Sequence, residues 1–194
     1  MTDALELTRD TIVPFLAEIF EKNASGEYLG EPVTIGAHML QCAQLAEQAG
    51  ASDEVVAAAL LHDVGHFTHE FESDAADHDI DTVHEEAGAR VLADWFPRLV
   101  VDCVRYHVDA KRYLCATDPS YFDKLSEASI HSLKLQGGPM STDEVTAFQA
   151  NPGLDDIIQV RLWDEQGKDP ALSTPAFAHY VPVLERVVKA HRPA

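Results

Sequence analysis

The sequence predicts an all-α fold, a single domain over residues 1–194 with about seven to nine helices. Apolar residues recur three and four positions apart along most of the chain, which is the spacing of one helix face. No stretch shows the alternation of apolar and polar residues that is typical of strands. A chain of 194 residues is long enough for one sizeable core, and no internal repeat or low-complexity linker divides it.

Capping residues and turn residues place the helices. A first helix is expected over residues 2–23, with Pro14 at its start or at a kink. Thr34 and Ser52 are expected N-caps for a helix over residues 34–49 and for a helix that ends at His62 and Asp63. Further helices are expected over residues 82–95, from Pro97 past His107, from Asp118 with a break near Ser126, from Ser141, and over residues 154–164 and 176–190.

The charge of the chain limits its partners. Lys and Arg number 14 against 33 Asp and Glu, so the formal net charge is −19. Such a protein is expected to repel nucleic acid and anionic membrane, although a small anionic substrate could still enter a locally basic pocket. The acidity could equally serve solubility alone.

Cysteine usage and the absence of targeting patterns predict a cytoplasmic protein. Cys42, Cys103 and Cys115 form no CxxC pair and leave an odd count, which favours a reducing compartment over a disulfide framework. The first ten residues lack the pattern of a signal peptide. No stretch approaches the roughly 20 apolar residues of a membrane span.

A histidine and an aspartate follow the most apolar run of the chain. His62 and Asp63 come directly after residues 57–61, and Gly65 and His66 follow them. A buried carboxylate is costly unless a positive charge compensates it, and a metal cation could do so with a histidine ligand beside it. The alternative is a helix end with two partly exposed polar residues.

Six polar residues share helices with apolar stripes, and together they suggest a metal site. They are His38, His62, Asp63, His84, His107 and Asp164. Imidazole and carboxylate are ligands of Fe, Mn or Zn, and the lack of cysteine ligands argues against a structural zinc. Six ligands exceed the need of one catalytic metal, and Asp63 has two oxygens that could bridge two ions.

The order of these residues resembles that of the HD-domain superfamily, which is named after the adjacent His-Asp pair. His84 and His107 resemble the additional ligands of its dinuclear branch. The similarity extends to the PhnZ-type oxygenases, which cleave the C–P bond of organophosphonates. The stretches that carry it are Tyr28-Leu29-Gly30-Glu31, His62-Asp63-Val64-Gly65-His66, Asp109-Ala110-Lys111-Arg112-Tyr113-Leu114, Leu135-Gln136-Gly137-Gly138-Pro139-Met140 and the late Asp164.

The resemblance implies an HD-domain helical bundle that holds two iron ions, Fe(II) and Fe(III), and uses O2 as co-substrate. By motif, one iron goes with His38, His62 and Asp164, the other goes with His84 and His107, and Asp63 bridges them. Tyr28 and Glu31 would be catalytic partners near the open iron position.

The resemblance also implies side chains that bind a hydroxyphosphonate. His66 and Ser129 are donors by resemblance alone, and Tyr28 and Glu31 would also contact the substrate. Lys111 lies one helical turn after His107, and Arg161 lies three residues before Asp164, so each could face the site. Taken singly, both could also be surface charges.

Two substrates fit the resemblance equally well. One is 2-amino-1-hydroxyethylphosphonate, which would give glycine, and the other is its N-trimethyl analogue, which would give glycine betaine. A quaternary ammonium prefers aromatic faces or diffuse negative charge, which Tyr28, Phe67, Tyr113 and the acidic residues 70–81 could supply. Phe67 and the acidic stretch favour the trimethylated substrate.

Two other functions use the same residues. A metal-dependent phosphohydrolase, the commonest HD-domain activity, would attack a phosphoester or nucleotide with metal-bound hydroxide. A non-catalytic metal or ligand sensor is the third reading. The sequence leaves the oligomeric state open.

Overall fold

The computed structural model describes residues 7–28, 30–68 and 83–192. Within them the chain forms ten α-helices and a short 3-10 helix, and the described residues contain no strand. The helices are α1 (Ile12–Asn23), α2 (Ile35–Gln48), α3 (Asp53–Leu61), η1 (Val64–Phe67, the 3-10 helix), α4 (His84–Leu92), α5 (Arg98–Thr117), α6 (Pro119–Phe122), α7 (Glu127–Leu135), α8 (Thr142–Gln149), α9 (Leu154–Gln166) and α10 (Phe177–Ala190). The all-α prediction is confirmed, and these residues hold one helix more than expected because the short α6 is separate from α7.

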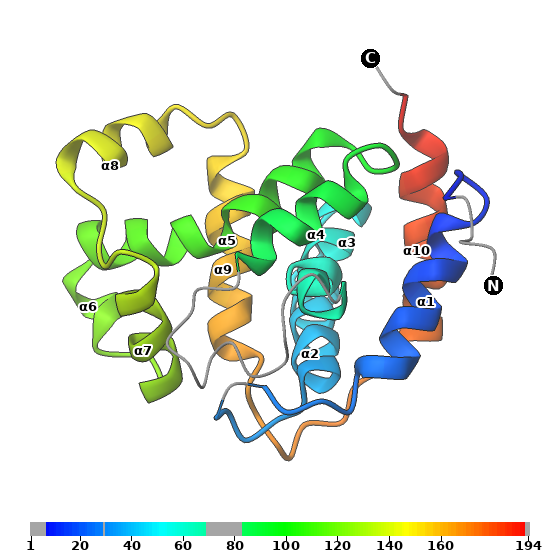
Figure 1. Cartoon of the computed structure of the whole chain (residues 1–194), viewed down its shortest axis with the longest axis horizontal. Coiled ribbons are helices and arrows are strands. Elements are labelled where there is room, and N and C mark those ends of the chain that lie inside the picture. Colours follow the sequence, from blue (N-terminus) through cyan, green and yellow to red (C-terminus); the bar gives the residue numbers. More distant parts are fainter. Residues whose placement is uncertain (1–6, 29, 69–82, 193–194) are drawn as a thin grey trace.

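Helix α3 lies at the centre of the molecule. Every residue from Val55 to Leu61 is buried, as expected for a helix that is apolar on all sides. It packs against α2, α5, α9 and α10 (Figure 1). Its C-terminal end, where the His-Asp pair follows, is therefore inside the protein.

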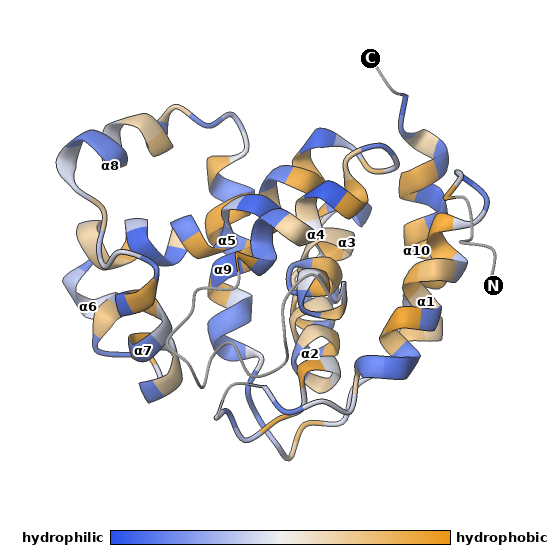
Figure 2. Ribbon diagram, viewed as in Figure 1, coloured by the Kyte–Doolittle hydropathy of each residue, from blue (hydrophilic) through white to orange (hydrophobic). Residues whose placement is uncertain are grey.

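One large hydrophobic core joins distant parts of the chain. Its buried residues run from Ile12 on α1 to Val188 on α10, and these two helices lie side by side at one end of the molecule (Figure 1). Figure 2 shows apolar residues gathered on the packed helices α2, α3 and α10. Helices α6, α7 and α8 lie at the opposite end, where a smaller core forms around Tyr121.

Helices α2, α3 and α8 have the N-cap residues that the sequence predicts. The side chains of Thr34, Ser52 and Ser141 each accept a hydrogen bond from a backbone N–H of the first turn. Ser141 and Glu144 form a complete capping box. These caps satisfy backbone groups that would otherwise lack partners at the helix ends.

Two helix starts differ from the prediction. Helix α1 begins at Ile12, and residues 7–11 are not helical, because Pro14 lacks an N–H and is best tolerated in a first turn. Residues 2–6 of the expected helix lie outside the described residues. Helix α4 begins at His84, and its N-cap Val83 has φ 47° and makes no side-chain capping bond. Thr82, where the sequence predicts that this helix begins, lies outside the described residues.

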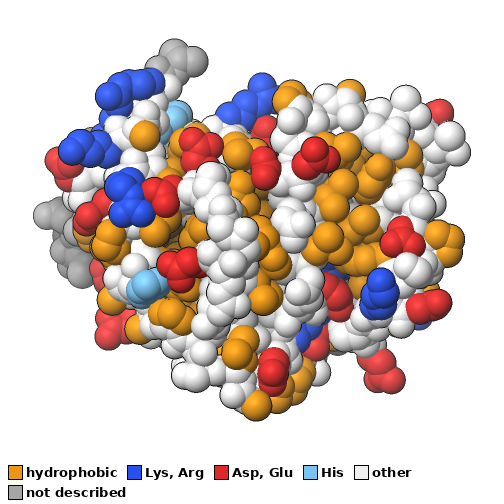
Figure 3. Space-filling model, turned by 180° about the vertical axis from the view of Figure 1, so that it is seen from behind, with side chains coloured by type: hydrophobic (Ala, Val, Ile, Leu, Met, Phe, Trp, Pro, Cys, Tyr) orange, Lys and Arg blue, Asp and Glu red, His pale blue; other side chains and the backbone are white. Residues whose placement is uncertain are grey.

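The surface agrees with an acidic protein. Figure 3 shows acidic side chains scattered between exposed apolar ones on one face of the molecule. None of the helices in the described residues has both the length and the apolar character that crossing a bilayer requires.

Candidate metal centre

Four buried histidines lie in two pairs whose Nε2 atoms face each other. The Nε2 atoms of His38 and His62 are 3.0 Å apart, and those of His84 and His107 are 3.1 Å apart. His38 comes from α2, His62 directly follows α3, His84 begins α4 and His107 lies in α5. Helix packing therefore joins side chains that are far apart in the sequence.

Asp63 lies between the two pairs. Its Oδ2 is 3.5 Å from Nε2 of His38 and 3.4 Å from Nε2 of His62. Its Oδ1 is 3.2 Å from Nε2 of His84 and 3.4 Å from Nε2 of His107. Asp164 completes the group, because its Oδ1 is 3.4 Å from Nε2 of His38. The six residues singled out in the sequence thus converge on one buried centre.

The turn after α3 allows adjacent residues to point into the same centre. His62 is the C-cap of α3, and Asp63 has φ −101° and ψ 12°, outside the helical region, before η1 begins. In a continuous helix, neighbouring side chains would diverge by roughly 100°. Ending the helix at Leu61 removes that constraint.

Second hydrogen bonds fix the orientation of three of the histidine rings. Nδ1 of His38 donates to the carbonyl oxygen of Gly167 at 2.9 Å. His62 and His107 donate in the same way to Ala59 and Val104, at 2.9 Å and 2.8 Å. This arrangement is typical of metal-ligating histidine, since it leaves the Nε2 lone pair directed at the metal.

The group fits a cation. The Nδ1 atoms of His38 and His62 both donate, so the lone pairs on their facing Nε2 atoms repel each other unless a proton or a metal cation lies between them. Oδ2 of Asp63 and Oδ1 of Asp164 are buried and lack a hydrogen-bond partner, although most buried polar atoms in proteins have one. The nitrogen and oxygen donors are those of Fe, Mn or Zn.

The pKa shifts at the centre also favour a positive charge there. Burial raises the pKa of Asp63, but His62, His107 and His84 outweigh it and hold that pKa well below its usual value. Burial lowers the pKa of His38 to about 4. It opposes protonation of His62 as well, but the charge of Asp63 raises the pKa of His62 to about 9. The anionic carboxylates thus favour positive charge between the rings.

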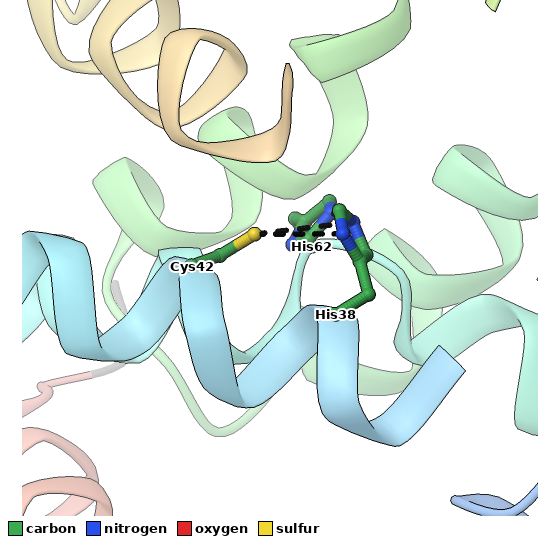
Figure 4. Close-up of side chains that lie close together, drawn as sticks. All are labelled: His38, Cys42 and His62. Atoms are coloured by element: carbon green, nitrogen blue, oxygen red, sulfur yellow. Dashed lines mark hydrogen bonds between the residues drawn. The ribbon is translucent and has the colours of Figure 1, made fainter. Parts of the chain in front are cut away.

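Cys42 is a neighbour of the centre that sequence reasoning did not include. It lies one turn after His38 on α2, and its Sγ is 3.8 Å from Nε2 of His38 (Figure 4). Sγ donates to the carbonyl oxygen of Trp163 at 3.5 Å, and burial raises the pKa of the thiol well above its usual value. A protonated thiol is a poor metal ligand, because the thiolate is the binding form.

A pocket opens onto the His84 side of the centre. Asp63, His84, His107 and Asp164 contribute to its lining, whereas His38 and His62 are fully buried beneath it. All residues that the sequence assigned to catalysis or substrate line this pocket: Tyr28, Glu31, Asp63, His66, Lys111, Ser129 and Arg161. The structure therefore brings together the whole predicted set.

Tyr28, Glu31 and His66 line the pocket beside the centre. The Tyr28 ring stacks on His38, with centroids 4.3 Å apart, and the N–H of Glu31 donates to the carbonyl oxygen of Tyr28 at 2.7 Å. His66 stacks on His84 at 4.0 Å, and burial lowers the pKa of His66 to about 3. Burial and the charges of Asp63 and Asp164 raise the pKa of Tyr28, which keeps its hydroxyl protonated at neutral pH.

Lys111 and Arg161 both line the pocket, as predicted, but they have different hydrogen-bond partners. Nζ of Lys111 donates to Oγ of Ser132 at 2.7 Å, and burial with the charge of Arg161 lowers the pKa of Lys111 to about 7. Arg161 donates to Tyr121 at 2.8 Å and also to Asp164 and Glu165. Arg161 thus orients Asp164 as well as lining the pocket.

Lys168 and Ser132 line the same pocket and were missed. Lys168 follows the C-cap Gly167 of α9 and is not helical, so no helical spacing in the sequence identifies it. Ser132 lies three residues after Ser129 on α7, so it shares that helix face.

The aromatic residues proposed for a quaternary ammonium are mostly elsewhere. Phe67 is 3% exposed and packs edge-on against Phe20 in the core, and Tyr113 packs against Phe148. Neither residue lines the pocket. The argument from Phe67 for a trimethylated substrate is therefore wrong. Tyr28 does line it, and residues 70–81 lie outside the described residues.

The chain is similar over most of its length to two proteins named as phosphonate dioxygenases. Residues 35–148 match the family described as HD domain. The chain is 55% identical over 189 residues to a protein of Leisingera caerulea named [1-hydroxy-2-(trimethylamino)ethyl]phosphonate dioxygenase (glycine-betaine-forming), covering 97% of this chain and 96% of that one. It is 38% identical to the hydroxymethylphosphonate dioxygenase of Gimesia maris, covering 91% of this chain and 88% of that one. An uncharacterized protein of Acanthamoeba polyphaga mimivirus is 32% identical, with 79% and 71% covered.

Proposed function

This chain belongs to the HD-domain family, and we propose that it is a dioxygenase that cleaves the C–P bond of [1-hydroxy-2-(trimethylammonio)ethyl]phosphonate. The observation that carries the proposal is the six-residue centre beside a pocket lined with cations, in a chain 55% identical to a glycine-betaine-forming relative over almost its whole length. The substrate takes up one O2 and gives glycine betaine, hydrogen phosphate and one proton. The primary amine, which would give glycine, is the second candidate for the same reaction.

We assign two iron ions, Fe(II) and Fe(III), to the centre. His38, His62 and Asp164 would hold one, His84 and His107 the other, and Asp63 would bridge them. The distances from the two oxygens of Asp63 to separate histidine pairs support this division. Iron at this position would supply the redox chemistry that O2 requires and a Lewis acid for substrate oxygens.

The pocket residues would bind and orient the phosphonate. Lys111, Arg161, Ser129 and His66 offer donors to its oxygens, and buried charge-assisted hydrogen bonds are stronger than neutral ones. The chain has a net charge of −19, yet this pocket gathers Lys111, Arg161 and Lys168 beside the acidic residues Glu31, Asp63 and Asp164. The three cations support a small anionic substrate in an otherwise acidic protein.

Tyr28 and Glu31 would accommodate the ammonium end. A quaternary ammonium cannot donate hydrogen bonds, and it is attracted to aromatic faces and to negative charge. Both residues come from the turn before α2 and line the pocket. Burial and then the charge of Asp63 raise the pKa of Tyr28, and its protonated hydroxyl lies beside that carboxylate.

Three expectations remain part of the proposal. They are a single domain over residues 1–194, a cytoplasmic location, and no nucleic-acid or membrane partner. The continuous core from Ile12 to Val188 supports the first, the three free cysteines support the second, and the net charge supports the third.

The test combines metal analysis with an oxygen-dependent assay. The purified protein should contain iron at two ions per chain and give an EPR signal of a coupled Fe(II)/Fe(III) pair. Phosphate release should be measured from the trimethylated and the primary-amine substrates, with and without O2. Release only with O2 supports the oxygenase, whereas release without O2 would contradict it. Activity without O2 on a phosphoester or nucleotide would favour the phosphohydrolase.

Variants separate the two halves of the centre. His84→Ala is expected to reduce the metal to about one ion per chain and abolish the coupled signal. Asp63→Ala is expected to abolish both metal pairing and turnover. Lys111→Ala should weaken substrate binding with the iron retained, and loss of iron in that variant would contradict its assignment.

A further inference from the structure

The side-chain ammonium of Lys168 contacts residues from three different parts of the chain around the pocket. Its Nζ lies 3.0 Å from Oε1 of Glu31, 3.0 Å from Oγ of Ser129 and 3.3 Å from Oε1 of Glu165. Glu31 precedes α2, Ser129 lies on α7 and Glu165 lies on α9. Lys168 thus contacts Glu31 and Ser129, two of the residues proposed to bind the substrate. The proposed function gives Lys168 itself no contact with the substrate.

The backbone on both sides of Lys168 is fixed to α2. The carbonyl oxygen of Gly167 accepts from Nδ1 of His38 at 2.9 Å. The backbone of Asp169 pairs twice with the amide of Gln41, which is 1% exposed, at 2.8 Å and 3.0 Å. Since both neighbours are held, the backbone position of Lys168 is fixed, and its ammonium is then placed by Glu31, Ser129 and Glu165.

The acceptor that Lys168 occupies is one specific oxygen of Glu31. Oε1 of Glu31 accepts from Lys168 at 3.0 Å and from Oγ of Ser126 at 2.5 Å. The side chains of Lys168 and Glu31 are 11% and 8% exposed, so solvent screens this pair little. Glu31 therefore presents a largely neutralised carboxylate with one of its oxygens already used.

We infer that Lys168 is a positioning residue that sets substrate specificity through Glu31, in favour of a quaternary over a primary ammonium. A primary ammonium gains most from a carboxylate whose lone pairs are free to accept its N–H groups. A trimethylammonium has no N–H to donate. Both ammonium ions lose the same attraction to the neutralised charge, but only the primary ammonium also loses a hydrogen bond when Oε1 is occupied. This inference rests on the proposed function, because it assumes a substrate with an ammonium beside Glu31.

The experiment compares kcat/KM for the two substrates in the iron-loaded full chain. In Lys168→Met, which removes the ammonium and keeps the length, the ratio of trimethylated to primary-amine substrate should fall about tenfold or more, as one charge-assisted hydrogen bond permits. Lys168→Arg, which can still donate to Glu31, should restore most of the ratio. The double variant Lys168→Met with Glu31→Gln should show a smaller shift than Lys168→Met alone.

Other results would overturn the inference. A ratio in Lys168→Met within about twofold of the wild type shows that Lys168 does not set specificity. An equal shift in the double variant shows that the effect does not pass through Glu31, and loss of iron from Lys168→Met shows a role in holding the metal centre. If the wild type turns over neither substrate, the proposed function itself fails and the inference falls with it.

Discussion

A Cβ atom placed on Gly65 would lie 1.8 Å from the carbonyl oxygen of His84. The backbone of η1 therefore touches the first residue of α4 directly, with no room for any side chain between them. Because His84 supplies one Nε2 atom to the centre, this contact fixes where that atom lies relative to Asp63. Glycine at position 65 is a steric requirement of the metal centre.

Gly65→Ala is expected to push α4 away and remove His84 from the centre. Metal content should fall from about two ions toward one per chain, and overpacking should lower the free energy of unfolding by roughly 1–3 kcal/mol. Metal analysis and chemical denaturation measure both. Gly50→Ala is the control, because Gly50 has φ +71° and no atom within 4 Å of the position that a Cβ would occupy. It should cost about 1 kcal/mol and keep both ions.

Cys42→Ala tests whether the thiol is a ligand. Burial and the nearby carboxylates of Asp164 and Asp63 raise the pKa of Cys42, so we expect a protonated thiol that packs against His38 and donates to the carbonyl oxygen of Trp163. The variant should keep its iron and its turnover and lose about 1 kcal/mol of stability through a small cavity. Iron loss comparable to that of His38→Ala would instead make Cys42 a ligand.

Lys111 predicts a pH dependence of substrate binding. Burial and the charge of Arg161 lower its pKa to about 7, so the free protein loses this positive charge as the pH rises through 7. Only the ammonium form attracts the phosphonate, and kcat/KM should therefore fall above pH 7. The assay is kcat/KM from pH 6 to pH 9 at constant ionic strength.

Lys111→Arg is the matched control for that profile. Arginine stays charged throughout this range, so its kcat/KM should follow only the titration of the substrate and of other groups. If the two proteins show the same fall above pH 7, Lys111 is not the titrating group.

Tyr121→Phe tests the support of Asp164. The Tyr121 hydroxyl accepts from Nε of Arg161 at 2.8 Å, and Arg161 in turn donates to Asp164. Removing the hydroxyl should weaken metal affinity about tenfold and stability by about 1 kcal/mol. Competition with a chelator measures the affinity.

Tyr180→Phe is a suitable control for Tyr121→Phe. Tyr180 is fully buried on α10, and its hydroxyl lacks a hydrogen-bond partner, so its removal should leave metal affinity unchanged. Equal effects of the two variants on metal affinity would contradict the support role of Tyr121.

Much of the site could be predicted from the sequence. Polar residues on apolar helices must be compensated when buried, and this rule together with the metal-ligand residue types points to His38, His62, Asp63, His84, His107 and Asp164. The caps at Thr34, Ser52 and Ser141 follow from local chemistry and hold in the structure. Phe67 shows the limit, because an aromatic residue near the His-Asp pair can turn into the core as readily as into a pocket.

The sequence by itself determined the helices, their apolar faces and the ligand types, because these depend on residues close together along the chain. Only the tertiary structure decided that Lys168 neutralises Glu31, 137 positions earlier in the numbering, and that Gly65 must be bare where it meets His84. It also decided that each oxygen of Asp63 faces its own pair of histidines. Such relationships depend on how whole helices pack, and local periodicity does not encode them.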